Sequence, residues 1–393
     1  MERDWDNCLA NTILQQIFFS ILRSVLWGTP TAIPADTDWL SVLNLSARHN
    51  CLHAFSVWLK TQRISTPFDK QLHANMYMTL QRQVRQNYLA IDVINLLALH
   101  NIPATLIKGY SLSVLYPDPD TRDFGDVDIY VGEANYLHAV EIVTAAYPNA
   151  HWHSSMHGGI HYILVIDENS DRVIELHRVT MEFHDKRANA LYQNFTSLQL
   201  TTNTSTIDIY GNTISIPDAT YNALYVFMHA WHHFEGRGVG FRQLADWALC
   251  LQQAHQQSST QEWKLLTHDI HQILSALHMK TAWQTFGHIL INELHLPEEA
   301  FPLYTTRYQN RAKRLLHQIL RDGHGGRPAA FNIKEIALMR RFPIERPSQY
   351  RVLQKAYTCS RLLFNAYQMG KFFPDLAWHE LKHSLLLGTK KHT

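Results

Sequence analysis

The sequence predicts an α+β protein in which a small mixed β-sheet is flanked by an N-terminal and a C-terminal helical region. Up to about residue 99 the apolar residues recur every three or four positions, which is typical of helices. From 104 to about 216 they alternate with polar residues, as they do in strands. Beyond Pro217 the helical spacing returns. We therefore expect three parts, 1–99, 100–217 and 218–393.

Short strands are expected in the central part, at 104–107, 127–131, 162–166, 173–176, 207–210 and 213–216. Polar turn residues join the third strand to the fourth and the fifth to the sixth, so both pairs are predicted hairpins. Helices are expected near 110–116 and 134–147. In the C-terminal part they are expected at 218–233, 239–256, 262–292, 307–321 and 348–368, with Asp218 as a cap of the first.

The composition excludes several classes of function. The 35 Lys and Arg residues nearly balance the 34 Asp and Glu residues, so no strong field favours a long nucleic acid. The four cysteines lie far apart, which favours reduced thiols in the cytoplasm. Acidic residues near the N-terminus do not fit a secretory signal, and no apolar segment is long enough to cross a membrane. We expect a cytoplasmic protein without a membrane partner.

Asp126 and Asp128 are the most informative residues of the chain. They are two positions apart in a predicted strand, so their carboxylates project from the same face. Carboxylates placed in this way can share a divalent metal ion. Mg²⁺ prefers oxygen ligands and usually binds one or two carboxylates together with substrate phosphates. The pair therefore suggests phosphate chemistry.

A second motif, Lys108-Gly109-x-Ser111, stands at the end of the preceding strand, where a helix is predicted to begin. Free backbone N–H groups and the positive end of a helix dipole bind phosphate at such a turn. A glycine after a strand is more often only a turn, so this motif is weak by itself.

Together, Lys108-Gly109-x-Ser111, Tyr116, Arg122 and Asp126-x-Asp128 resemble the nucleotidyltransferase superfamily, which has the fold of DNA polymerase beta. The nearest branch is a poorly characterised family of bacterial nucleotidyltransferases, and the resemblance covers about residues 100–250. It implies a third carboxylate on a neighbouring strand. Glu175, in Glu175-Leu176-His177, is the candidate.

The resemblance also implies a role for each residue. Asp126, Asp128 and Glu175 would be catalytic and would bind Mg²⁺ or Mn²⁺. Four residues would bind the phosphates of a nucleoside triphosphate (NTP): Lys108, Gly109, Ser111 and Arg122. An alternative for Arg122 is an ion pair with an acidic residue of its own loop, namely Asp118, Asp120 or Asp123.

Two histidine-containing segments leave alternatives open. Downstream of the sheet, His229 and His233 precede Arg242 and Asp246, which lie four residues apart on one helix face. That pair is either a structural ion pair or a contact to the nucleotide or acceptor. The other segment contains His151, His153, His157 and His161. A zinc site is disfavoured there, because Gly158 and Gly159 interrupt the helix that would align its last two histidines.

The expected function is Mg²⁺-dependent transfer of a nucleoside monophosphate from an NTP, such as ATP, with release of pyrophosphate. The acceptor is an unidentified small molecule, a protein or an RNA end. For an RNA end the candidate contacts are Arg311, Lys313, Arg314, Arg340, Arg341 and Arg346. The alternatives are a catalytically silent nucleotide-binding or regulatory protein and a metal-dependent hydrolase that uses the histidine-rich loop.

Overall fold

A computed structural model describes residues 12–154, 161–166, 172–183, 185–236, 238–326 and 369–379. Some sequence predictions lie outside these residues: the turn at 167–171, the helix at 348–368, His157, Arg340, Arg341 and Arg346. The side chains of His153 and His161 are likewise not described, so the histidine-rich loop stays a sequence prediction. Within the described ranges, no helix combines the length and the apolar character needed to cross a membrane.

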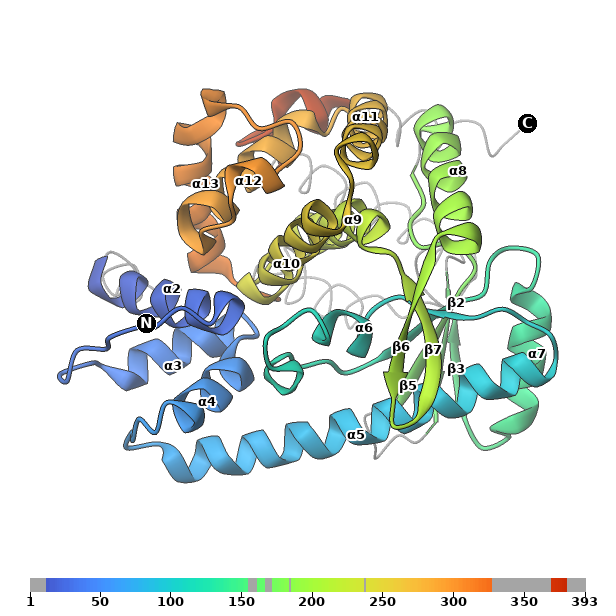
Figure 1. The fold of residues 1–393 in the computed structure, drawn as a ribbon, viewed down its shortest axis with the longest axis horizontal. Coiled ribbons are helices and arrows are strands. Elements are labelled where there is room, and N and C mark those ends of the chain that lie inside the picture. Colours follow the sequence, from blue (N-terminus) through green and yellow to red (C-terminus); the bar gives the residue numbers. More distant parts are fainter. Residues whose placement is uncertain are drawn as a thin grey trace, which may run out of the picture.

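The N-terminal part is helical, as predicted. Its helices are α2 (Thr12–Trp27), α3 (Trp39–Arg48), α4 (Leu52–Thr61) and α5 (Asp69–Leu99). Residues 28–38 separate α2 from α3, and Asp38 caps α3 by accepting a hydrogen bond from the Ser41 backbone N–H at 3.2 Å. The long helix α5 runs from this helical part to the sheet (Figure 1).

The central sheet is mixed. Its strands are β1 (Thr105–Leu106), β2 (Val127–Tyr130), β3 (His151–Ser154), β4 (His161–Val165) and β5 (Val173–His177). They are arranged in the order β1-β2-β5-β4-β3, in which β2 and β5 are parallel and the other neighbours antiparallel. The predicted pairing of β4 with β5 is confirmed. Strand β3 was not predicted from the sequence.

Short helices and a second hairpin complete the central part. The helical segments are α6 (Tyr110–Ser113), the 3₁₀ turn η1 (Pro119–Thr121), α7 (Tyr136–Ala146) and α8 (Lys186–Thr202). The predicted hairpin of β6 (Thr204–Ile209) and β7 (Asn212–Pro217) is confirmed. Helix α8 was missed, although Asp185 caps it by accepting a hydrogen bond from the Ala188 N–H at 2.8 Å.

The C-terminal part contains α9 (Ala219–Gly236), α10 (Phe241–Gln257), α11 (Thr260–Ala276), α12 (Lys280–Leu294) and α13 (Gln309–Asp322), with 3₁₀ turns η2 (Glu298–Ala300) and η3 (Thr306–Tyr308). Asp218 accepts a hydrogen bond from the Thr220 N–H at 2.8 Å, as expected of a cap. The single helix predicted at 262–292 is wrong. His278 adopts a left-handed conformation, with φ of 57°, and thereby separates α11 from α12.

Two hydrophobic cores lie on opposite sides of the central sheet. One joins the apolar residues of β2 and β5 to those of α5 and α7, which cover that side of the sheet (Figure 1). The other joins α2–α4 to α8 and to the C-terminal helices. The alternation of strand side chains places Val127, Ile129 and Leu176 in the first core. It therefore turns the acidic residues between them toward the second core.

Candidate active site

The acidic residues of β2 and β5 come together because the two strands are parallel neighbours in one register. Asp128 pairs with Glu175, and Tyr130 pairs with His177. Asp126 lies directly before β2, and His177 is two residues after Glu175, so all four side chains project from the same sheet face. The sequence prediction that Glu175 lies beside the Asp126/Asp128 pair agrees with this register.

Asp128 is at the centre of the group and is completely buried. Its Oδ1 atom lies 2.5 Å from Lys108 Nζ and 3.0 Å from His177 Nε2. The same His177 nitrogen lies 3.5 Å from Glu175 Oε2. The other oxygen of Asp128, Oδ2, has no hydrogen-bond partner within the described part of the chain.

The charges of this group act strongly on one another. The negative charge of Asp128, followed by burial, raises the pKa of Asp126. Burial alone would raise the pKa of Glu175, but the hydrogen bond from His177 and the charge of Lys108 lower it to about 2. Burial opposes the charge of Lys108 as well, yet the carboxylate of Asp128 raises the Lys108 pKa well above its ordinary value. Glu175 is thus ionised and Lys108 protonated at neutral pH.

The turn at Gly109 lies next to this group. Gly109 has φ of 65° and ψ of −126°, a conformation that residues with a Cβ atom rarely adopt. The Ser111 hydroxyl, predicted to face phosphates, is buried and donates instead to the Lys108 carbonyl at 3.1 Å. Helix α6 itself has only four residues. The turn therefore positions Lys108 at the carboxylates, whereas Ser111 stabilises the turn from within.

The Arg122 guanidinium is also hydrogen-bonded to groups of the protein itself. Its Nε and Nη2 atoms donate to the two carboxylate oxygens of Asp246 at 2.7 and 2.9 Å, and its Nη1 donates to the Gly109 carbonyl at 2.8 Å. Asp246 accepts a further hydrogen bond from the Tyr116 hydroxyl at 2.8 Å. The partners suggested by the sequence, Asp118, Asp120 and Asp123, are wrong. Arg122 is 3% exposed and supports the Gly109 turn from behind.

Arg242, in contrast, is only partly held by Asp246. The predicted pair across one helix turn is present, with 3.5 Å between Arg242 Nη1 and Asp246 Oδ2. Its side chain is 21% exposed, whereas that of Arg122 is 3% exposed. Its positive charge opposes the rise in the pKa of Asp126 and contributes, after burial, to the lowered pKa values of His229 and His233. The charge of Arg242 therefore acts both on Asp126 and on the histidines of α9.

Helix α9 faces the acidic group from the other side. Burial, and then the charge of Lys108, lowers the pKa of His229 well below its usual range. His229 and His233 are one helix turn apart, and their Nε2 atoms are 3.1 Å from each other. Burial raises the pKa of Tyr225, and the charge of Lys108 opposes that effect. Sequence reasoning missed Tyr225, because an apolar-flanked tyrosine on a buried helix resembles any other core residue.

The segment that carries Asp126 is held by α5. Gln83 donates to the Arg122 carbonyl at 2.7 Å, and Gln86 donates to the Gly125 carbonyl. Arg82 pairs with Asp123 at 2.5 Å. These α5 residues were not predicted. Their spacing of three to four along a helix, with polar side chains on its buried side, is the signal that could have suggested them.

The donor set fits a divalent cation. Asp128, Glu175 and His177 each offer a ligand atom, and these three atoms lie within 4.8 Å of one another. The buried and unpartnered Asp128 Oδ2 adds a further acceptor, since an ionised carboxylate has more lone pairs than Lys108 and His177 use. Asp126 is outside this close group of three. The Asp126 carboxylate lies beside this group, near enough for the charge of Asp128 to raise the Asp126 pKa.

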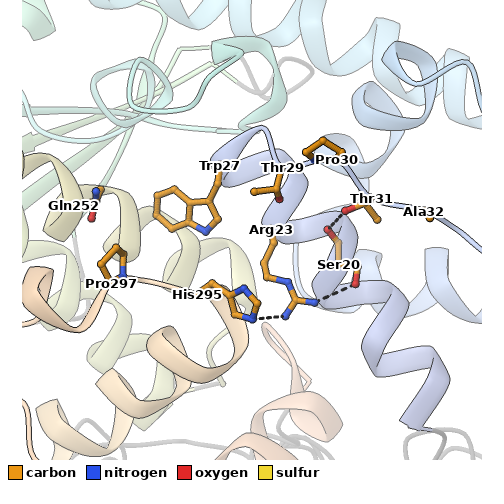
Figure 2. Close-up of a pocket in the computed structure, with 10 residues that line it drawn as sticks. All are labelled: Ser20, Arg23, Trp27, Thr29, Pro30, Thr31, Ala32, Gln252, His295 and Pro297. Carbon is orange, nitrogen blue, oxygen red and sulfur yellow. Dashed lines mark hydrogen bonds between the residues drawn. The ribbon is translucent and has the colours of Figure 1, made fainter.

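A cavity of about 570 Å³ lies away from these residues, between α2 and the chain around His295 (Figure 2). Arg23 extends along it and contacts Ser20 Oγ at 3.0 Å and His295 Nε2 at 3.1 Å. Its Nη1 atom also donates to the Glu293 carbonyl at 3.3 Å. Arg23, the charged residue of this cavity, is thus hydrogen-bonded within the protein. We therefore place the candidate active site at the carboxylates.

Comparisons with known proteins identify the family of the chain. No curated protein sequence matches the chain significantly. One similar solved structure is the crystal structure of an antigenic nucleotidyltransferase-like protein from Paracoccidioides brasiliensis, at 16% identity and a TM-score of 0.33, over 55% of this chain and 92% of that one. That likeness is too low to inform the site. A family model described as "Uncharacterised nucleotidyltransferase" matches residues 35–284, which include every site residue above. The chain therefore belongs to this family of uncharacterised nucleotidyltransferases.

Proposed function

We propose that the protein transfers a nucleoside monophosphate from an NTP to a hydroxyl or phosphate acceptor. In this reaction the acceptor oxygen forms a bond to the α-phosphorus, and the bond from the α-phosphorus to the oxygen bridging to the β-phosphate breaks. Pyrophosphate leaves with that bridging oxygen, and the acceptor proton passes to the site carboxylates or to solvent. The observation that carries the proposal is the register that sets Asp128 against Glu175, in a chain of this family.

The cation proposed for the site is a divalent metal, Mg²⁺ or Mn²⁺. Bound there, it would neutralise phosphate charge and stabilise the attacking and leaving oxygens of an in-line displacement. Asp126, Asp128 and Glu175 are the carboxylates proposed to hold it. The charge of Asp128 raises the pKa of Asp126, and this repulsion between neighbouring carboxylates supports a requirement for an added cation.

Positive side chains on the same side would receive the triphosphate. Lys108 lies against Asp128, and Arg242 has a partly exposed side chain whose charge acts on Asp126. We propose these two residues as the phosphate contacts. Arg122 is proposed to act indirectly, because it binds the Gly109 carbonyl and Asp246. Gly109 would contribute through the turn that it forms and through its backbone.

The acceptor stays open among a small molecule, a protein and an RNA end. For the RNA end, α13 presents Lys313 and Arg314 as exposed residues and Arg311 as a partly buried one. The silent nucleotide-binding alternative is disfavoured by the presence of all three carboxylates. The hydrolase alternative depends on the histidine-rich loop, most of which lies outside the described residues. We keep the cytoplasm as the expected location.

The test is transfer of label from each of the four α-³²P-labelled NTPs in a cell extract, with Mg²⁺ or Mn²⁺ added. Wild type is compared with Asp128→Asn and with Glu141→Gln, a control that removes an exposed carboxylate of α7. We expect labelled product and pyrophosphate with wild type and Glu141→Gln, and neither with Asp128→Asn. Equal labelling by wild type and Asp128→Asn would contradict the proposal.

A further inference from the structure

The geometry points to His177 as a ligand of the site's metal, together with Asp128 and Glu175, and to a preference of this mixed site for Mn²⁺ over Mg²⁺. A set of carboxylates alone would make the preference the opposite or absent. This inference deepens the proposed function, because it concerns the cation of the same site. It rests on that function only for the location of the site, and it is tested by binding without nucleotide.

The first observation is the position of one nitrogen atom between two carboxylates. His177 Nε2 lies 3.0 Å from Asp128 Oδ1 and 3.5 Å from Glu175 Oε2. Atoms that share one metal at about 2.1 Å from it are about 3.0–3.4 Å apart when the angle between them is roughly 90–110°. The two measured separations are close to that range, and the ligand atoms of all three side chains lie within 4.8 Å of one another. No change of strand register is needed to bring them together.

A purely structural role for His177 explains this spacing less well. One N–H group has one direction and donates a good hydrogen bond to a single acceptor, because the bond weakens steeply as its angle falls. Here the same nitrogen faces an oxygen from each of two neighbouring strands. While it carries a proton, Nε2 donates to these carboxylates; with the imidazole neutral and its proton on Nδ1, the same nitrogen can bind a metal from the same position.

The second observation is independent and concerns Asp128. This carboxylate is completely buried, and its Oδ2 atom has no hydrogen-bond partner in the described part of the chain. A buried acceptor without a partner costs about 1–3 kcal/mol, and more when it is charged. Coordination of a cation would remove that cost, so the unpartnered oxygen of Asp128 supports a cation site at this group.

The metal preference follows from the nature of the donors. Mg²⁺ demands oxygen ligands in near-ideal octahedral geometry, whereas imidazole nitrogen binds later divalent metals more readily. Mn²⁺ accepts carboxylate and imidazole together and still supports phosphate chemistry. Replacing an oxygen donor by His177 therefore weakens Mg²⁺ binding relative to Mn²⁺. Asp126 lies outside the close group of three ligand atoms.

The experiment measures Mn²⁺ binding to the nucleotide-free, full-length protein by electron paramagnetic resonance. Loss of the free Mn²⁺ signal gives the dissociation constant, and pulsed measurement detects coupling to ¹⁴N in the first coordination sphere. We expect ¹⁴N coupling in wild type and none in His177→Gln, together with at least about tenfold weaker Mn²⁺ binding. The affinity for Mg²⁺, measured by competition, should fall less than the affinity for Mn²⁺. The preference for Mn²⁺ should therefore be smaller in His177→Gln.

His229→Gln is the matched control, since it removes the histidine of α9 whose pKa is lowered by Lys108. It should keep the ¹⁴N coupling. Wild type grown with ¹⁵N-histidine provides a measurement that needs no substitution, and its ¹⁴N coupling should disappear. The inference is overturned if wild type binds no Mn²⁺, if its ¹⁴N coupling survives ¹⁵N-histidine labelling, or if the coupling survives in His177→Gln or is lost in His229→Gln.

These outcomes are separate from those of the transferase assay. Protein with ¹⁴N-coupled Mn²⁺ but without labelled product would retain the ligand assignment and contradict the proposed function. Transfer of label by a protein whose Mn²⁺ lacks ¹⁴N coupling would retain the proposed function and contradict the ligand assignment.

Discussion

Asp246 and Asp128 are both buried carboxylates that contact positive side chains, yet their hydrogen bonding differs. Both oxygens of Asp246 are used, by Arg122 and Tyr116 at 2.7–2.9 Å and more weakly by Arg242 at 3.5 Å. Asp128 uses one oxygen for Lys108 and His177, and its other oxygen has no hydrogen-bond partner among the described residues. Around Asp246 two arginines face one carboxylate. Around Asp128 further carboxylates gather.

This difference separates structural from functional charge in one molecule. A buried ion pair whose atoms are all satisfied holds its surroundings in one arrangement, as the network around Asp246 does for the Gly109 turn. A group with excess negative charge and an unused oxygen is suited to a ligand that carries positive charge. The comparison predicts that substitutions in the first group reduce stability and that substitutions in the second reduce activity.

The largest effect is expected for Asp246→Asn. Removal of this charge leaves Arg122 buried without its partner, which should lower the free energy of unfolding by about 3–5 kcal/mol. Urea unfolding measures the change, and Asp92→Asn, at an exposed position of α5, is the control. A loss below about 1 kcal/mol would mean that the network around Asp246 is not the stabilising one.

Asp128→Asn should show the converse behaviour. We expect nucleotidyl transfer to fall by at least about 100-fold, because the cation proposed to stabilise transition-state charge would lose a carboxylate ligand. The loss in free energy of unfolding should be smaller than for Asp246→Asn, since Asp126 and Glu175 still act on the charge of Lys108. Label transfer and urea unfolding of the same samples decide this. Greater destabilisation by Asp128→Asn than by Asp246→Asn would break the comparison.

The two arginines that contact Asp246 allow a sharper test. Arg242→Gln should raise the KM for the NTP by about tenfold, equivalent to about 1.4 kcal/mol of binding, and change stability by less than about 1 kcal/mol, because its ion pair is partly exposed. Arg122→Gln should destabilise the protein by several kcal/mol. Steady-state kinetics and urea unfolding are compared. If Arg242→Gln leaves KM unchanged, Arg242 does not contact the phosphates.

The smallest effect is expected for Tyr116→Phe, which removes one hydrogen bond to Asp246 and keeps the ring. The free energy of unfolding should fall by about 1 kcal/mol, with KM unchanged. Thermal and urea unfolding give the first quantity, and the transfer assay gives the second. A raised KM without a loss of stability would place Tyr116 in the active site.

The acidic part of the site could be predicted because it depends on local rules. The spacing of Asp126 and Asp128 fixes their common face, and the strand pattern around Glu175 identifies a neighbouring strand. The remaining contacts join distant parts of the chain. Nothing near Arg122 in the sequence indicates that its partner is Asp246, 124 residues later. Acidic residues of its own loop were nearer, but Asp123 is taken by Arg82 of α5.

The same limit explains the errors in the fold. Strand β3 and helix α8 are short or polar elements that their neighbours stabilise, and their own apolar pattern is weak. The break between α11 and α12 depends on the left-handed backbone of His278, a residue type that does not by itself indicate a helix end. Here packing between elements decided the structure.

The separation of Arg122 and Asp246 by 124 residues also has a consequence for synthesis. A ribosome that adds about 5–20 residues per second makes Asp246 roughly 6–25 s after Arg122. During that interval the arginine that supports the Gly109 turn lacks its carboxylate partner. The nascent chain can therefore form the sheet early, but the turn beside the carboxylates reaches its final state only after helix α10 has been made.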